Sequence, residues 1–203
     1  MTEPARHPID FIAPVDNEER SRALAALGIF FVKALLLVPH LILLSLYAVA
    51  VQVIVWIGYW YILITGEMPF WVLNLENIFL EWTSRVFAWF TSVTDAYPTF
   101  GTDEHHPAQI EIAKAGHPRS RWLALAGILL IRSIMAIPHL FILAWLTLGT
   151  LFLAWLGYVL ILINGRLPLE LHWYFVGFHR WWARTWAWIA AITDVYPPFT
   201  LRR

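Results

Sequence analysis

The chain contains no cysteine among its 203 residues. Without thiols it forms no disulfide, no thiolate metal site and no cysteine nucleophile. Charge is also scarce, since Asp, Glu, Lys and Arg together supply 14% of the residues, whereas a soluble domain typically carries about 25%. The formal net charge is zero, so no broad positive field attracts nucleic acid, and we expect no nucleic-acid partner.

Two long stretches are almost free of charge. Lys33 is the only charged residue from Ala23 to Thr65, and Arg132 is the only one from Trp122 to Asn164. Hydrophobic residues make up 60% of the chain and the mean hydropathy is +0.62. About 20 apolar residues suffice to cross a bilayer, so the sequence predicts an integral membrane protein. The polar, acidic stretch from Met1 to Arg22 predicts that no cleavable signal peptide precedes the first apolar run.

The sequence is one unit written twice, at a constant offset of 99 positions, as from Pro39 to Pro138. Five motifs recur at this offset: Arg20-Ser21-Arg22 and Arg119-Ser120-Arg121; Pro39-His40-Leu41 and Pro138-His139-Leu140; Trp56-x-Gly58-Tyr59 and Trp155-x-Gly157-Tyr158; Gly66-x-x-Pro69 and Gly165-x-x-Pro168; Thr94-Asp95-x-Tyr97-Pro98-x-Phe100 and Thr193-Asp194-x-Tyr196-Pro197-x-Phe199. We therefore expect two structural units, residues 1–101 and 102–203.

Each apolar run is too long for a single crossing, since 43 residues of helix from Ala23 to Thr65 would measure roughly 65 Å against a hydrocarbon core of about 30 Å. Pro39 and Pro138 are the expected breaks, because proline removes a backbone donor and restricts the residue before it. The predicted helices are about 23–38 and 41–65, then about 122–137 and 140–164. Each pair forms a transmembrane hairpin that turns at Pro-His.

Charge supports this hairpin arrangement. It places both termini and the mid-chain connector on one side, together with every Lys and Arg except Lys33 and Arg132. Such a bias indicates that this side is cytoplasmic. In the alternative, only 41–65 and 140–164 cross and the shorter helices lie flat.

A third helix is expected in each unit, over about 70–93 and 169–192. In the first copy one polar stripe follows helical spacing: Asn74, Asn77, Glu81, Ser84, Ala88 and Thr91. This predicts an amphipathic helix in the headgroup layer, and the alternative is an ordinary buried helix packed over the hairpin. The fold class is thus an all-α integral membrane protein of two tandem repeats.

Two short segments alternate apolar and polar residues, Ile9-Asp10-Phe11 and Ile110-Glu111-Ile112. Alternation of this kind is typical of a strand. Because the segments stand at comparable places in the two copies, we expect one strand from each and pairing between them.

The Pro-His pair, the Gly-x-x-Pro break and the ending Thr193-Asp194-Val195-Tyr196-Pro197-Pro198-Phe199 resemble a bacterial membrane-protein family catalogued as domain of unknown function 4389. The first copy departs from the pattern at Thr99, where a second proline is usual. The family's arginine pair in the third helix is supplied in full only by Arg180 and Arg184. The resemblance implies a bacterial membrane domain, one per repeat, and implies no activity or catalytic residue.

His40 and His139 are the candidate cofactor residues. Histidine is a common metal ligand, and paired imidazoles at similar depth would suit haem, another pigment or a metal. In the alternative each imidazole caps exposed carbonyls at the end of a helix or meets headgroup water. Because no carboxylate accompanies either histidine, we predict no cofactor and no metal.

Four cations are candidates for lipid headgroups. Lys33 and Arg132 stand six residues before their prolines, about 9 Å along a helix, so their side chains are expected to snorkel to the interface or to bind a lipid phosphate there. Arg180 and Arg184 are interleaved with tryptophans, a combination that suits anionic lipid.

Asp95 and Asp194 each precede a Tyr-Pro pair, Tyr97-Pro98 and Tyr196-Pro197. We interpret these residues, with Pro39 and Pro138, as structural turn motifs in which the carboxylates accept hydrogen bonds. A catalytic carboxylate pair is the alternative.

The leading functional hypothesis is a non-enzymatic accessory or scaffold subunit that contacts lipid, a larger membrane complex or further copies of itself. The expected location is the bacterial cytoplasmic membrane, with several passes and cytoplasmic termini. One alternative is a small transporter or channel, although polar residues in the long helices are few: Gln52, Thr147 and Thr150. The other is a catalytic or cofactor-binding membrane protein that uses the His or Asp pair.

Overall fold

A computed structural model describes residues 7–15, 19–113 and 118–202. Within them lie two strands and six helices: β1 (Ile9–Ile12), α1 (Arg22–Ile29), α2 (Val32–Thr65), α3 (Phe70–Phe90), β2 (Gln109–Ile112), α4 (Arg121–Ile128), α5 (Ile131–Asn164) and α6 (Leu169–Ile189). The helices of the second copy match those of the first in order and in length. The duplication in the sequence is therefore a duplication in structure.

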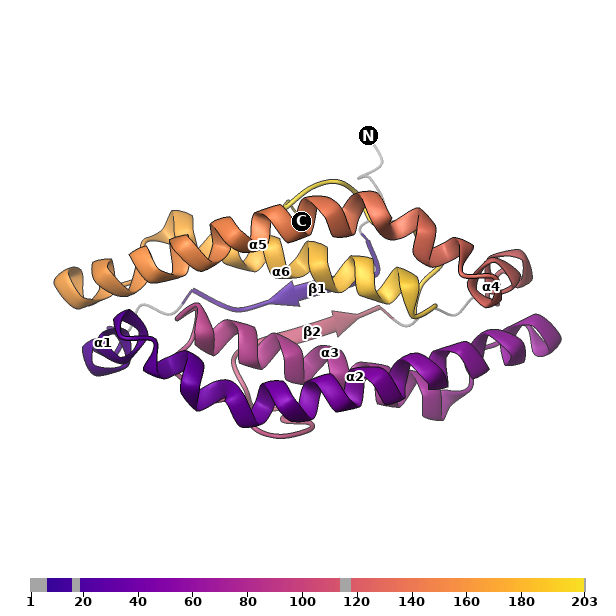
Figure 1. The fold of residues 1–203 in the computed structure, drawn as a ribbon, viewed down its shortest axis with the longest axis horizontal. Helices are drawn as coiled ribbons and strands as arrows, with labels where there is room; N and C mark the ends of the chain where they lie inside the picture. The colour runs from indigo at the N-terminus through magenta and orange to yellow at the C-terminus, as the bar shows by residue number, and fades with distance from the viewer. Residues whose placement is uncertain (1–6, 16–18, 114–117, 203) are drawn as a thin grey trace.

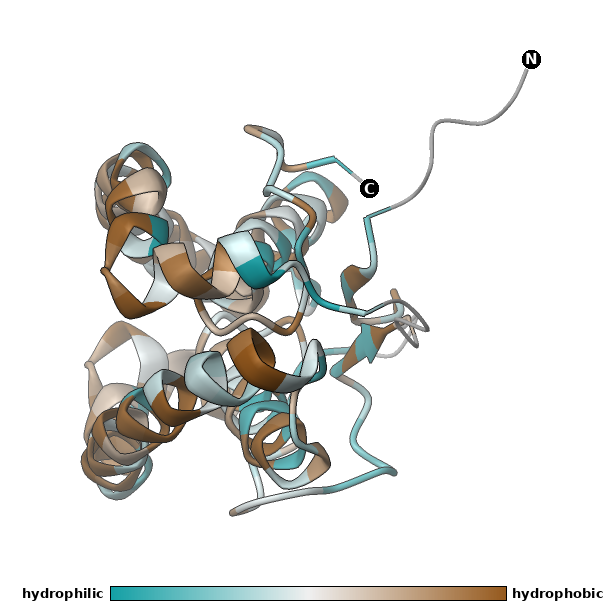
Figure 2. Ribbon diagram, turned by 90° about the vertical axis from the view of Figure 1, so that its right-hand side faces the viewer, coloured by the Kyte–Doolittle hydropathy of each residue, from teal (hydrophilic) through white to brown (hydrophobic). Residues whose placement is uncertain are grey.

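The elements form three layers (Figures 1 and 2). The long helices α2 and α5 run antiparallel along the whole molecule and make the front layer, α3 and α6 lie behind them, and β1 and β2 lie at the back. The front layer carries mostly hydrophobic residues, whereas hydrophilic segments gather toward the opposite side. The molecule thus has one apolar face and one polar face.

The predicted hairpins at Pro39 and Pro138 are wrong, because α2 and α5 run through both prolines without a break. A proline inside a helix removes one N–H and disturbs the preceding turn. That turn finds outside donors here. The Tyr97 hydroxyl donates to the Leu36 carbonyl at 3.0 Å, and the Tyr196 hydroxyl donates to the Met135 carbonyl at 2.8 Å.

The chain turns earlier than predicted, between a short helix and a long one. Phe31 and Leu130 adopt the left-handed conformation, with φ of 61° and 60°, at the start of α2 and α5. The short helices begin at serines that act as N-caps, since the Ser21 hydroxyl accepts the Leu24 N–H at 3.3 Å. The sequence does not predict this turn, because the left-handed residue is neither a glycine nor an asparagine but Phe31 or Leu130.

The two halves exchange their short helices. α1 packs against α5 and α4 packs against α2 (Figure 1). The backbone N–H of Arg20 donates to the Gly165 carbonyl at 2.8 Å, and Arg119 donates to the Gly66 carbonyl at the same distance. The units expected over 1–101 and 102–203 are therefore interlocked in space.

α3 and α6 start where the third helices were expected and end three residues before the expected 93 and 192. Both helices agree with the alternative of a packed helix, since 10 of the 21 residues of α3 and 14 of the 21 residues of α6 are buried. Two members of the polar stripe bond within their own helix, since Ser84 donates to the Leu80 carbonyl at 2.6 Å and Thr91 donates to the Phe87 carbonyl at 2.9 Å, whereas Asn74 is exposed.

The strand prediction is confirmed. β1 and β2 pair antiparallel, with Ile9 opposite Ile112 and Phe11 opposite Ile110. Side chains of α6 reach alternate carbonyls on the other edge of β1: Arg184 bonds to Ile9 at 3.0 Å, Arg180 to Phe11 at 3.3 Å and His172 to Ala13 at 3.1 Å. This spacing follows from the two-residue repeat of a strand, and it fastens the ribbon to the helical layers.

Candidate functional site

Each repeat builds an aromatic cluster around its histidine. In the first, the indole N–H of Trp82 donates to His40 Nδ1 at 3.0 Å. The Phe100 ring stacks on the imidazole with centroids 4.1 Å apart, and the Tyr97 ring meets it edge-on at 5.3 Å. The Pro-His motif and the Tyr-Pro-x-Phe motif therefore belong to one structural unit.

The second repeat reproduces this cluster. Trp181 donates to His139 Nδ1 at 2.9 Å, Phe199 stacks on the imidazole at 3.8 Å, and Tyr196 lies edge-on at 4.9 Å. Because both copies form the same cluster although their surroundings differ, the cluster is a property of the repeat itself.

The histidine clusters favour a structural role over a ligand site. An indole N–H only donates, so the Nδ1 atoms of His40 and His139 are unprotonated, and each neutral ring carries its proton on Nε2. Both Nε2 atoms are buried and have no hydrogen-bond partner. Each imidazole is covered by a phenylalanine of its own repeat. The structure does not bring the two rings to a shared cofactor.

The prediction that Lys33 snorkels is wrong. Its side chain is fully buried, and its Nζ donates to the Trp89 carbonyl at 2.6 Å and to Ser92 Oγ at 3.0 Å. The ammonium also lies 4.5 Å from the Trp89 ring centroid and 5.1 Å from that of Tyr158. Lys33 thus sits at the C-terminal end of α3, where the helix dipole favours a cation.

Arg132 makes the equivalent contacts at the end of α6, so its predicted snorkelling is also wrong. It donates to the Asp194 carboxylate at 3.2 Å and to the Thr193 carbonyl, and its guanidinium carbon lies 4.2 Å from the Trp188 ring centroid. Its exposed fraction is 1%. The free-energy cost of burying Lys33 and Arg132 is therefore offset by hydrogen-bond acceptors and aromatic rings inside the protein.

Asp95 and Asp194 hold the starts of the short helices. Asp95 accepts the backbone N–H of Ser21 at 2.6 Å, and Asp194 accepts that of Ser120 at 2.7 Å. The two carboxylates thus belong to separate clusters. The structure does not assemble the catalytic pair that the symmetry allowed.

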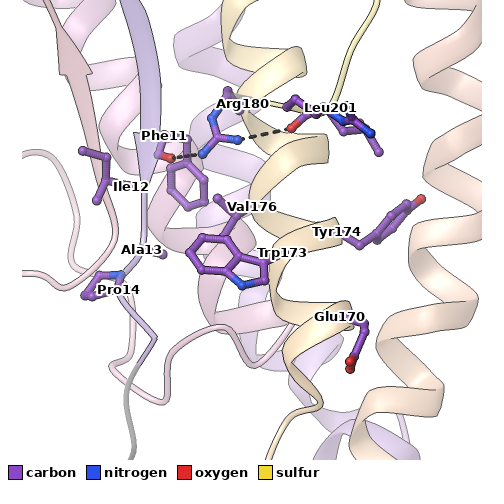
Figure 3. A pocket seen from close by; sticks show the side chains of 11 residues that line it. Phe11, Ile12, Ala13, Pro14, Glu170, Trp173, Tyr174, Val176, Arg180 and Leu201 are labelled. Atoms are coloured by element: carbon purple, nitrogen blue, oxygen red, sulfur yellow. Dashed lines mark hydrogen bonds between the residues drawn. The ribbon is translucent and has the colours of Figure 1, made fainter.

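Arg180 lies at one end of a pocket of about 570 Å³ between β1, α6 and the C-terminal segment (Figure 3). Its guanidinium pairs with Asp10, donates to the Leu201 carbonyl at 3.2 Å and donates to the Phe11 carbonyl at 3.3 Å. The Trp173 ring lies across the pocket in Figure 3. The Arg180 guanidinium therefore joins β1 and the C-terminal segment to α6.

Arg184 repeats that arrangement one turn further along α6. It donates to the Ile9 carbonyl at 3.0 Å and to the Arg202 carbonyl at 3.1 Å, and its exposed fraction is 1%. All four cations predicted to meet lipid headgroups thus lie inside the protein.

Two buried residues were not predicted from the sequence, although each stands where the repeat departs from its other copy. Glu76 is fully buried where the second copy has Phe175, and burial raises the pKa of its carboxyl to about 8 although Trp186 donates to it at 2.9 Å. His179 replaces Leu80 of the first copy, and its Nε2 lies 2.8 Å from Ser84 Oγ. Burial lowers the pKa of His179 to about 3, which leaves the ring neutral.

No metal centre is formed by the part of the chain that the structure describes, because nowhere in it do three or more His, Asp or Glu side chains gather as ligands. The Ser84–His179 pair has neither residue exposed. What the two repeats share is an internal framework of hydrogen bonds and ring contacts.

The most extensive surface feature is the front of α2 and α5. Both helices are long and apolar enough, by length and composition, to cross a membrane, α2 over Val38–Thr65 and α5 over Ile131–Asn164. Large apolar side chains stand exposed along both: Leu35, Leu46, Val49, Val53, Ile57 and Ile64 on α2, and Ile134, Phe141, Trp145, Leu148, Phe152 and Ile163 on α5. We call this surface the apolar face. It is the candidate functional site.

Comparison with known families gives one match. The family model described as domain of unknown function (DUF4389) matches residues 29–101 and again residues 128–200. The two matched regions correspond to the two copies and together span more than half of the chain. No curated protein and no solved structure matches.

Proposed function

Because the chain belongs to the family described as domain of unknown function (DUF4389), whose name states no activity, we propose a function from the geometry. The protein is a non-enzymatic scaffold that lies within one leaflet of a membrane. The apolar face of α2 and α5 contacts the acyl chains, and the polar face stays in water.

The exposure of α2 and α5 carries this proposal. Leu46 and Leu148, near the middle of the two helices, have exposed fractions of 64% and 60%. A soluble monomer rarely exposes a contiguous apolar patch of more than a few hundred Å². Lipid supplies the cover that such a surface requires, and the view along the molecule sets it opposite the hydrophilic side (Figure 2).

The layered fold favours lying flat over crossing. Each long helix has 34 residues, about 51 Å at 1.5 Å per residue, against a hydrocarbon core of about 30 Å. In an upright molecule the strand ribbon at mid-length (Figure 1) would lie at the bilayer centre, together with the exposed Glu104, whose carbonyl accepts the Gln109 side chain of β2 at 2.7 Å. Irregular backbone exposed to lipid does not occur there. In the flat orientation these segments remain outside.

A scaffold role agrees with what the polar face offers. It carries the strand ribbon and the pocket in which Trp173 is half exposed, a surface suited to a partner subunit or a further copy of the chain. We place the protein at the cytoplasmic membrane of bacteria, with its polar face and termini toward the cytoplasm.

Vesicle flotation tests the membrane contact. A variant with Leu46→Glu and Leu148→Glu loses about 1.5–3 kcal/mol of apolar burial at each site and is expected to bind vesicles of phosphatidylcholine and phosphatidylglycerol at least tenfold more weakly. The matched control, Gln109→Glu, adds a carboxylate at the exposed strand β2 and leaves binding unchanged. Equal binding by all three proteins would rule out the apolar face as the contact.

The scaffold role has its own test. Gentle extraction of the native protein should recover it with associated proteins, which mass spectrometry then identifies. A clean monomer with no associated protein would contradict a scaffold, whatever the flotation result.

A further inference from the structure

A groove opens beside the middle of α5, on the apolar face. It has a volume of about 260 Å³, and its walls come from α3, α5 and α6. The exposed side chains of Thr147 and Leu151 stand at its α5 edge. Because this edge is continuous with the apolar face, whatever covers that face also reaches the groove.

The three hydroxyl groups and the imidazole of the groove are already hydrogen-bonded. Thr83, Thr147 and Thr150 each donate a hydroxyl proton to a carbonyl one turn earlier in their own helix, at 2.7, 2.7 and 2.8 Å. His179 is held by Ser84, and burial lowers its pKa to about 3, so it carries no charge. The walls therefore offer methyl groups and rings, which suit an apolar occupant.

One wall is a continuous stack of rings. Phe87 lies parallel to His179 with centroids 4.6 Å apart and to Phe178 at 5.7 Å, and His179 stacks on Trp182 at 5.1 Å. Flat ring surfaces in a narrow groove suit an extended hydrocarbon chain.

The groove breaks the symmetry of the duplication. At the position of Phe87 the second repeat has the larger Trp186, which is anchored by its bond to Glu76 and packed on Phe79 at 4.7 Å. At the position of Thr147 the first repeat has Ala48. The α3 wall of the groove thus has a smaller ring where the other half has an anchored indole, although Thr147 itself is larger than Ala48.

We propose that this groove holds one acyl chain of a membrane phospholipid. The inference rests on the proposed function, because the bilayer that covers the apolar face supplies the chain. An acyl chain drawn between α3, α5 and α6 fixes the depth and rotation of the protein in its leaflet, which a smooth apolar surface does not.

Photocrosslinking tests the occupant. The full chain is bound to phosphatidylcholine vesicles that contain a phosphatidylcholine with a diazirine in one acyl chain, and labelled residues are identified after illumination by peptide mass spectrometry. We expect labels on the groove residues Phe87, Phe178 or Trp182, in addition to labels on outer residues such as Leu148.

Matched variants locate the chain. Thr147→Phe fills the mouth of the groove and should abolish the labels on its walls, whereas Leu148→Phe, next to it on the outer surface, should leave them intact. Thr83→Trp, which introduces the residue that the second repeat carries at position 182, is a second filling variant should the first fail to fold.

The outcomes separate the two proposals. Labels on the outer residues with none in the groove would overturn the acyl-chain site and leave the membrane contact standing. Groove labels that survive both filling substitutions would also overturn it. No labels on either set would overturn both proposals.

Discussion

Tyr158 of the second repeat lies against Gly28 of the first, so closely that a Cβ atom on this glycine would meet the ring at 2.6 Å. The centroid of the Tyr158 ring also lies 5.1 Å from the Lys33 ammonium, and the Tyr158 hydroxyl donates to the Phe90 carbonyl. Tyr59 makes the equivalent contacts with Gly127, Arg132 and Ile189. The tyrosine of the Trp-x-Gly-Tyr motif therefore joins the two halves at two equivalent places.

Replacing the small residue at this junction tests its importance. Gly28→Ala forces the Tyr158 ring to move, and overpacking of this kind costs about 1–3 kcal/mol. Chemical unfolding in detergent measures the loss. The control is Gly149→Ala, whose nearest neighbour would be the Tyr174 hydroxyl at 3.9 Å; better helix propensity should stabilise it by up to about 1 kcal/mol. Equal effects at the two glycines would contradict the close junction.

The two aspartates are expected to respond differently to the same change. Asp194→Asn removes a charge that pairs directly with buried Arg132 at 3.2 Å, whereas the charge of Asp95 acts on buried Lys33 without a direct ion pair. Both asparagines keep an oxygen for the serine N–H that the aspartate accepts. Because Asp194 is 25% exposed, its loss should cost less than the roughly 3–5 kcal/mol of a fully buried pair. We expect Asp194→Asn to lower the unfolding free energy by about 1–3 kcal/mol more than Asp95→Asn. A reversed order would show that Arg132 does not depend on Asp194.

Pro39→Ala distinguishes a continuous helix from a hairpin. In the structure Pro39 lies inside α2, where alanine is intrinsically preferred by about 3 kcal/mol. We expect unchanged helix content by circular dichroism and a free energy of unfolding that is equal or higher. Loss of the folded protein on this substitution would mean that the proline defines a turn after all.

Glu76 makes stability depend on pH. Burial raises the pKa of its carboxyl from 4.5 to about 8, so the folded chain binds this proton more tightly than the unfolded chain does. The protonated Glu76 carboxyl contributes its full stabilisation below about pH 4.5. This contribution falls as the pH rises and is lost above about pH 8, so the free energy of unfolding decreases by a few kcal/mol over this range. Glu76→Gln should flatten this part of the profile, and Glu67→Gln, at an exposed turn, should leave it as it was. A sloping profile in Glu76→Gln would assign the dependence to another group.

The duplication, the paired strands and the starts of α3 and α6 were all predicted from sequence, because motifs, alternation and helix-start signals are local. The passage of α2 through Pro39 was not. It is accompanied by a contact that is distant in the chain, since Tyr97, 61 residues beyond Leu36, donates to the Leu36 carbonyl in the turn before the proline.

The exchange of short helices was beyond sequence analysis for a different reason. Both repeats carry the same glycine and the same tyrosine. The sequence alone is therefore equally compatible with Tyr158 contacting Gly127 of its own half and with Tyr158 contacting Gly28 of the other. Nothing in the motifs states which pairing is made. The buried positions of Lys33, Arg132, Arg180 and Arg184 were missed likewise, since their acceptors are backbone carbonyls or side chains that lie far along the chain.

Labelling of single introduced cysteines tests the orientation in the membrane most directly. The chain has no native cysteine, so only the introduced one reacts. Glu67 follows α2 and Arg166 follows α5, and these two helices end at opposite ends of the molecule (Figure 1). In sealed inverted vesicles, Glu67→Cys and Arg166→Cys should both react with an impermeant maleimide from the same, cytoplasmic side. Reaction from opposite sides would show that the long helices cross the bilayer and would contradict the flat orientation.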